Sequence, residues 1–273
     1  MRKYIIFIIE FIKMKELFLI FLFLQNYNII FGQYIYGLDV CNQDAKIEGK
    51  LNLDAGDNNL IIGKDAGISL VDSEFNTIIG PEAGKILEYG LENTFIGYRA
   101  GYKLVGFSNL ANGDDNVYIG AKSGFNSTNG LSNVFLGIES GYNNVGGIEN
   151  TFIGRRSGYN NNGERGIFLG GWTGYNNTTG NRNIFIGYKA GYYSTGSDLL
   201  YIENSDTNSP LIYGEFNNNK VQINGSLHVS DALQLIPQAT PSGSCVDNGE
   251  MIFGTDNELY LCKSGTWKIV VTN

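Results

Sequence analysis

The side chains that could carry out chemistry are few. The chain of 273 residues contains one histidine, His228, so a Ser-His-Asp triad would depend on it alone and no histidine cluster can hold a metal. His228 stands in a strand-like run, where a partly exposed histidine is ordinary. Glu203 and Asp206 have the residue types of a glycoside hydrolase pair, but they adjoin "NSDTNSP", which is typical of turns. We therefore expect that the protein is not an enzyme.

The glycine-rich segments also lack the residues that bind cofactors. The recurring Gly-x-x-[Ala/Ser/Thr]-Gly segment is not followed by the Lys-Ser/Thr and helix of a phosphate-binding loop, and it does not match the calcium-binding nonapeptide repeat. Its third residue is charged in seven of eight copies, with both signs, which indicates a solvated edge rather than a ladder of calcium ligands. We expect no cofactor and no bound metal.

A repeat of about 17 residues accounts for these glycines. Eight units follow the pattern Asn-x-Φ-[Ile/Leu]-Gly-x-x-[Ala/Ser/Thr]-Gly-Φ, where Φ is apolar in nearly every copy. The spacings between first glycines are 17, 17, 23, 17, 17, 16 and 17 residues, and the second glycine always follows four positions later. The first glycines are Gly63, Gly80, Gly97, Gly120, Gly137, Gly154, Gly170 and Gly187.

This repeat predicts an all-β fold. Two glycines per unit exclude a helical solenoid, because each costs ~1 kcal/mol inside a helix. Stretches such as "NTFIG" favour strands, and parallel stacking ~4.8 Å apart pairs each coil with its neighbours. We therefore predict a parallel β-solenoid of eight coils over residues 59–197. Its structural repeat residues include Asn93, Ile96, Gly97, Gly101, Asn150, Ile153, Gly154, Gly158, Asn183, Ile186, Gly187 and Gly191.

The asparagine that opens seven of the eight units should stack into a ladder at a turn. Each amide can bond its own backbone and the asparagine one coil away. Gly166 interrupts this column in the seventh unit. We interpret the asparagines as structural rather than catalytic.

The two apolar residues before each first glycine predict two apolar faces, since neighbours on a strand point to opposite sides. We expect the second, always aliphatic, residue to fill the coil interior. The first, usually aromatic, residue should then be buried between identical chains, because a monomer would expose too large a stripe. The alternative is that longer turns cover the stripe. The expected interface residues are Phe95, Tyr118, Phe135, Phe152, Phe168 and Phe185.

The N-terminal residues 1–33 are predicted to be a signal peptide, with the apolar core "LFLIFLFL" after Lys13 and Lys15 and cleavage near Gln33. Met14 is an alternative start. The competing interpretation is a membrane anchor over Tyr4–Leu24, but charged residues break that run. We expect a secreted or cell-surface protein, with residues 34–58 as an N-terminal cap.

The C-terminal part departs from the repeat. We predict short strands over residues 198–230, a linker over 231–242, and a three-stranded meander over 243–273. Cys245 and Cys262 flank a predicted hairpin and are expected to form a disulfide, which leaves Cys41 over. Tyr260 and Trp267 are expected in the core of this module, with carbohydrate stacking as the alternative.

The "NTFIGYRAGY" units resemble the repeats of phage tail-fibre-like surface proteins and, more distantly, the head repeats of trimeric autotransporter adhesins. The resemblance covers roughly Asn59 to Tyr193, although adhesin heads usually have shorter units. It implies a left-handed β-roll, a homotrimer and a role in surface attachment. The segment "GTDNELYLCKSGTWK" is similar to end modules of secreted fibre-like proteins in Bacteroidetes-type bacteria.

Two functions follow from these expectations. The first is a structural, adhesive fibre with a surface glycan or a protein as its receptor. The second is a solenoid that binds a glycan or another ligand such as ice, although ice binding favours a regular Thr array and the column after Asn holds three Thr in eight. A net charge of −8 argues against a nucleic-acid partner, and the membrane is expected to matter only through the N-terminal segment.

Overall fold

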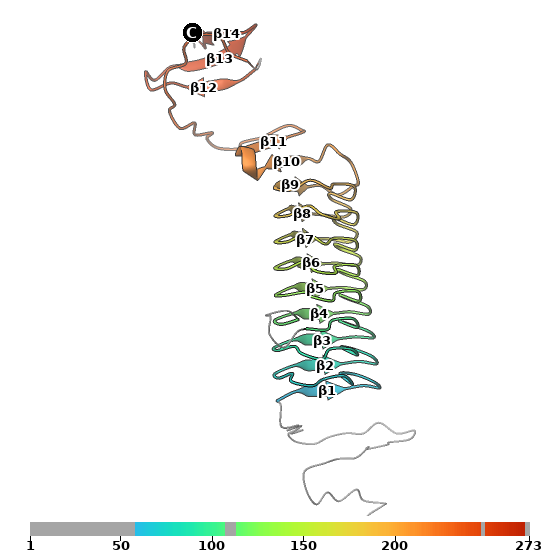
Figure 1. The fold of residues 1–273 in the computed structure, drawn as a ribbon. Helices are drawn as coiled ribbons and strands as arrows, with labels where there is room; N and C mark the ends of the chain where they lie inside the picture. Colours follow the sequence, from blue (N-terminus) through green and yellow to red (C-terminus); the bar gives the residue numbers. More distant parts are fainter. Residues whose placement is uncertain (1–57, 107–112, 247–248, 271–273) are drawn as a thin grey trace, which may run out of the picture. The chain divides into compact units, whose positions relative to one another are not determined.

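A computed structural model describes residues 58–106, 113–246 and 249–270 (Figure 1). It is all-β, with a long parallel solenoid and a separate three-stranded antiparallel sheet. The predicted signal peptide, nearly all of the predicted cap and Cys41 lie outside the described residues.

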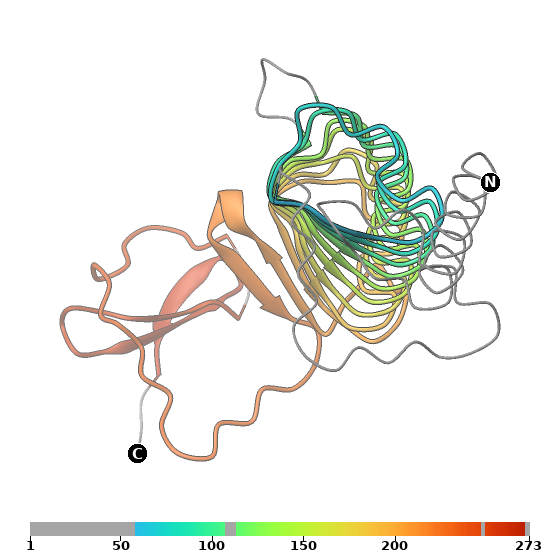
Figure 2. The same cartoon turned by 90° about the horizontal axis from the view of Figure 1, so that it is seen from below.

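Eight three-residue strands, one in each repeat unit, build the solenoid. Each strand pairs in parallel with the next, so that Thr151 lies opposite Ile167, for example, and the strands form one side of the stacked coils (Figure 2). This confirms the predicted parallel solenoid of about eight coils of about 17 residues. The strands are β1 (Leu60–Ile62), β2 (Thr77–Ile79), β3 (Thr94–Ile96), β4 (Val117–Ile119), β5 (Val134–Leu136), β6 (Thr151–Ile153), β7 (Ile167–Leu169) and β8 (Ile184–Ile186).

The sheet continues beyond the eight units. Strand β9 (Leu199–Ile202) pairs in parallel with β8, and β10 (Ile212–Glu215) and β11 (Lys220–Ile223) then extend the same sheet in antiparallel fashion. A short 3-10 turn, η1 (Phe216–Asn218), joins the last two strands. The repeat pattern misses β9 because Glu203 stands where the other coils carry their first glycine.

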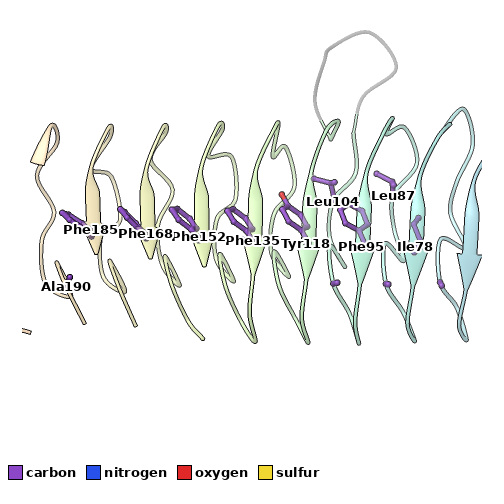
Figure 3. Packing of buried hydrophobic residues seen from close by; sticks show 13 residues of the cluster. Ile78, Leu87, Phe95, Leu104, Tyr118, Phe135, Phe152, Phe168, Phe185 and Ala190 are labelled. Atoms are coloured by element: carbon purple, nitrogen blue, oxygen red, sulfur yellow. The ribbon is translucent and has the colours of Figure 1, made fainter. Parts of the chain in front are cut away.

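The solenoid interior is a column of aromatic rings, and on this point the sequence prediction is wrong. The middle residue of each strand points inward, while the first and third residues point outward. The six aromatic residues that we expected between chains are each 0 % exposed within a single chain, from Phe95 to Phe185 (Figure 3). The aliphatic residues that we placed inside, such as Ile153, are partly exposed on the outer side of the sheet.

Glycine explains why the rings point inward. A Cβ atom added at Gly158 would lie 2.4 Å from the ring of Phe152, and its φ of +57° also favours glycine. In the coils of β3 to β8 the glycine therefore leaves its space to the ring, whereas Ile61 and Ile78 take the middle position in β1 and β2. At the first glycine of the unit, Gly154, a Cβ would lie 2.5 Å from the carbonyl oxygen of Gly170 in the next coil.

The rings stack at the spacing of the strands. Adjacent ring centroids from Phe95 to Phe185 are 4.6–5.1 Å apart, with nearly parallel planes. Tyr118 fits this dry column because its hydroxyl bonds Ser127 Oγ at 3.0 Å and Asn116 Oδ1 at 3.1 Å. Burial raises the pKa of Tyr118, so the hydroxyl stays protonated.

The C-terminal module is the predicted meander. Strands β12 (Met251–Phe253), β13 (Leu259–Lys263) and β14 (Thr266–Ile269) pair in antiparallel fashion in sequence order. The predicted disulfide between Cys245 and Cys262 is present, with a Cα–Cα distance of 5.8 Å. Tyr260 is buried, as expected, and Trp267 is half-buried.

The inward orientation of the rings predicts opposite effects of substitution at two adjacent residues. Phe152→Ala should destabilise the solenoid by about 3–5 kcal/mol, because it leaves a cavity and interrupts the ring column. Ile153→Ser should change stability by about 1 kcal/mol or less, because the side chain is partly exposed. Circular dichroism during denaturation, at a protein concentration low enough to exclude self-association, measures both. A larger effect at Ile153 would contradict the orientation.

Candidate functional site

The asparagine ladder predicted from the sequence is present inside the turn before each strand. In a typical step, Asn150 donates to Asn133 Oδ1 through its backbone N–H at 3.0 Å and its Nδ2 at 3.2 Å, and Nδ2 also donates to the Gly163 carbonyl at 2.8 Å. The same contacts link Asn93 to the coils on either side. These side chains are buried with their polar atoms engaged, so their role is structural.

Gly166 interrupts the ladder, as the sequence predicts. Its backbone N–H still donates to Asn150 Oδ1 at 2.8 Å, but it has no side chain to accept the N–H of Asn183. Asn183 continues the column on its other side, where its Oδ1 accepts from the Leu199 N–H at 2.9 Å. The seventh coil therefore holds to the eighth with fewer side-chain bonds than the other coils use.

The charged column of the repeat forms ion pairs between adjacent coils. Arg156 bonds Glu139 at 2.5 Å, and Arg99 bonds Glu82. The bonds from Arg99 and Lys85 lower the pKa of the Glu82 carboxyl. These pairs are partly exposed and each contributes little to stability, which fits the predicted solvated edge.

Glu203 and Asp206, the carboxylates considered for catalysis, are engaged in other interactions. The Glu203 carboxylate accepts the backbone N–H of Asn204 at 2.7 Å and of Leu211 at 3.0 Å, and these bonds, led by Asn204, lower its pKa. Asp206 lies 3.3 Å from Lys189 Nζ. The prediction that turn formation explains these residues is confirmed for Glu203. In the described part of the chain, no group of three or more His, Cys, Asp or Glu side chains is arranged to hold a metal ion.

A second aromatic ladder, which the sequence analysis did not assign, lies on the outside of the coils. It is formed by the residue after the second glycine in the third to eighth units, and neighbouring centroids are 4.9–5.1 Å apart. Because each ring is stacked on the next, the faces that a sugar would need are already covered. The ladder runs through Tyr102, Phe125, Tyr142, Tyr159, Tyr175 and Tyr192.

The outer face of the solenoid sheet is the candidate functional surface, because it is apolar and exposed. We define it as the first and third residues of strands β1–β8, 16 positions of which none is charged. Ile62, Leu136 and Ile153 are 46, 42 and 38 % exposed. The third position is always Ile or Leu, whereas the first position holds three Thr among aliphatic residues.

This outer face extends along the whole sheet. The pairing register aligns Ile186 with Ile202, Ile202 with Ile212, and Ile212 with Ile223, so the third-position column reaches β11. At ~4.8 Å per strand the face is about 50 Å long, and two columns of side chains cover about 500 Å². This is near the upper end of what a soluble monomer exposes, which marks the face as an interaction surface.

The comparisons with known proteins place no constraint on these interpretations. No family model, no curated protein and no solved structure matches the chain. Among residues 58–106, 113–246 and 249–270, no helix has the length and apolar character needed to cross a membrane.

The gap in the asparagine ladder predicts a stabilising substitution. Gly166→Asn should raise stability by about 1 kcal/mol, because the introduced amide bonds Asn150 and accepts from Asn183. The backbone at this position does not have a positive φ, and the atom nearest to an added Cβ is 3.2 Å away. The control is Gly171→Asn, where an added Cβ has no atom within 3.6 Å and no ladder to join. Equal denaturation midpoints for the two variants would contradict the prediction.

Removal of the disulfide should destabilise the C-terminal module without affecting the solenoid. Cys245→Ser with Cys262→Ser should remove about 3 kcal/mol from the module, because a 17-residue separation is no longer closed. The buried Tyr260 should then become accessible to protease cleavage in its strand, while the solenoid keeps its circular dichroism. Limited proteolysis with mass spectrometry measures this. If the substituted module resists the protease as well as the unsubstituted one, its core alone keeps it folded and the prediction is wrong.

Proposed function

We propose that the protein is an exported structural and adhesive fibre protein without catalytic activity, whose solenoid assembles in parallel with identical chains as a homotrimer. The observation that carries this proposal is the charge-free, apolar outer face of a sheet of eleven strands. The surface supports packing rather than chemistry, since it offers methyl groups and a few Thr hydroxyls.

The regularity of the outer face favours an identical partner. Its side chains repeat at the strand spacing over the whole sheet, so a partner must match that spacing to pack against it. A charged side chain in such an interface would lose its water, which is unfavourable without a partner of opposite charge. Among the 16 positions no charge is present, whereas the ion-paired column with Glu139 and Arg156 lies outside them.

A closed ring of chains fits the composition of the two columns. In a heterologous interface, one chain's third-position column faces the next chain's first-position column. The two columns differ here, because Ile and Leu fill one while Thr, Val, Leu and Ile share the other. Three copies are the number that the resemblance to adhesin heads implies. The aromatic rings, which we first placed in this interface, support each chain from within.

Export and attachment complete the proposal. The apolar segment near the N-terminus supports export, and the disulfide suits an oxidising compartment outside the cytoplasm. The solenoid serves as a rigid shaft, and the receptor is a glycan or a protein on the surface to which the fibre attaches. A glycan-binding solenoid is less well supported, because the outer aromatic ladder has its ring faces covered.

Sedimentation of residues 34–273 tests the assembly. The protein should sediment at three times its chain mass, and Leu136→Glu with Ile153→Glu should yield folded monomers, because carboxylates would meet in the interface. The control is Val145→Glu with Asn162→Glu, two exposed positions of the same coils that lie outside the outer face, which should leave the trimer intact. An unsubstituted protein that sediments as a stable monomer would contradict the proposal.

A further inference from the structure

The connecting segment, residues 224–237 between β11 and the C-terminal module, exposes large apolar side chains. Leu227 is 62 % exposed and Ile236 is 75 % exposed, and Val229 and Leu233 are also exposed. Among the described residues, no backbone N–H or C=O from Gly225 to Leu235 has a hydrogen-bond partner. An extended chain with free backbone groups and exposed apolar side chains is a strand without a neighbour.

The sequence of this segment has the two-residue period of a half-buried strand. Odd positions carry Val221, Ile223, Gly225, Leu227 and Val229, while the even positions between them carry Gln, Asn, Ser and His. After a bend at residues 230–231, Leu233 and Leu235 are again apolar at odd positions, but Ala232 and Ile236 are apolar at even positions, so the strict alternation ends at Val229. Only the first part of this pattern is paired in a single chain, as β11.

The apolar side of this pattern belongs to the same surface as the outer face. Ile223 lies opposite Ile212, which lies opposite Ile202, and that column continues into the third positions of the solenoid strands. Strand β11 is the last of the sheet, so its outer edge has no neighbouring strand in the described chain. Whatever covers the outer face therefore also reaches the start of the connecting segment.

We infer that the connecting segment pairs with the same segment of neighbouring copies, with its odd-numbered side chains in the seam that the outer face begins. This inference rests on the proposed assembly and adds the place where the chains are joined by backbone hydrogen bonds. The outer face alone covers about 500 Å², whereas a stable interface needs about 800 Å² from each partner. The connecting segment supplies further apolar area.

Charge favours an identical copy over an unrelated protein as the occupant. Residues 220–237 contain only two charged side chains, Lys220 and Asp231. Copies in parallel register bring like residues together, so a segment built for this pairing must be nearly free of charge. Asp231 lies at the bend, where the alternating pattern is interrupted, and Lys220 begins β11.

Site-specific crosslinking tests the inference in the mature chain, residues 34–273, with Cys41→Ser and the disulfide retained. Leu227→Cys and Ser226→Cys should both crosslink chain to chain with a short bismaleimide about tenfold more than Val145→Cys, an exposed residue of a coil turn, because strands paired in parallel register place each residue beside its own copy. Denaturing electrophoresis measures the product at twice the chain mass. Sedimentation of each sample reports assembly separately.

The outcomes separate this inference from the proposed function. A trimer in which Leu227→Cys and Ser226→Cys crosslink no more than Val145→Cys overturns the pairing of the segment and leaves the fibre proposal standing. A monomer without crosslinks overturns both. In the variant with Leu227→Glu and Val229→Glu, the protein concentration at which the trimer dissociates should be at least tenfold higher than in the unsubstituted protein, and the circular dichroism should be unchanged. A crosslink to a different protein in place of a second copy would also overturn the inference.

Discussion

An aromatic ring and the backbone of a glycine face each other at close range in the coils of β3 to β8. At Phe152 and Gly158 the space between them would not admit a Cβ atom. This contact fits the inward direction of the middle strand residue and, through strand alternation, the outward direction of its two neighbours. The ring column and the apolar outer face are thus two results of one steric constraint.

Much of the fold follows from the sequence because each residue type that recurs at a fixed place in the repeat has one physical role. The asparagines specify a ladder, and strand-forming triplets between glycines specify parallel stacking. The disulfide could also be predicted, because two cysteines flank a hairpin. The inward face could not be chosen from the pair Phe152-Ile153, since both residues are apolar and alternation alone is symmetrical. The signal that decides it is Gly158, whose position four residues after the first glycine shows where the ring must lie.

The candidate site was harder to predict than the fold because it consists of ordinary core-like residues placed outside. Ile153 and Leu136 look like interior residues in the sequence, and only their exposure shows that they form a surface. The surface extends to Ile223 through the pairing register of β9, β10 and β11. The sequence did not predict this register, because Glu203 stands where the other coils have their first glycine. The long sheet therefore joins the repeats and the segment after them into one surface.

The hydrogen bonds that join the coils all point along the direction of stacking, as does the bond from Thr151 N to Gly166 O at 2.8 Å. A tensile load along that direction passes through every interface between coils in series, and the interface that yields first opens while the other coils stay stacked. Each coil that opens releases about 55 Å of chain at ~3.3 Å per residue. Such a shaft would lengthen stepwise and dissipate mechanical work under a pull, with the coils that remain stacked still able to bear the load.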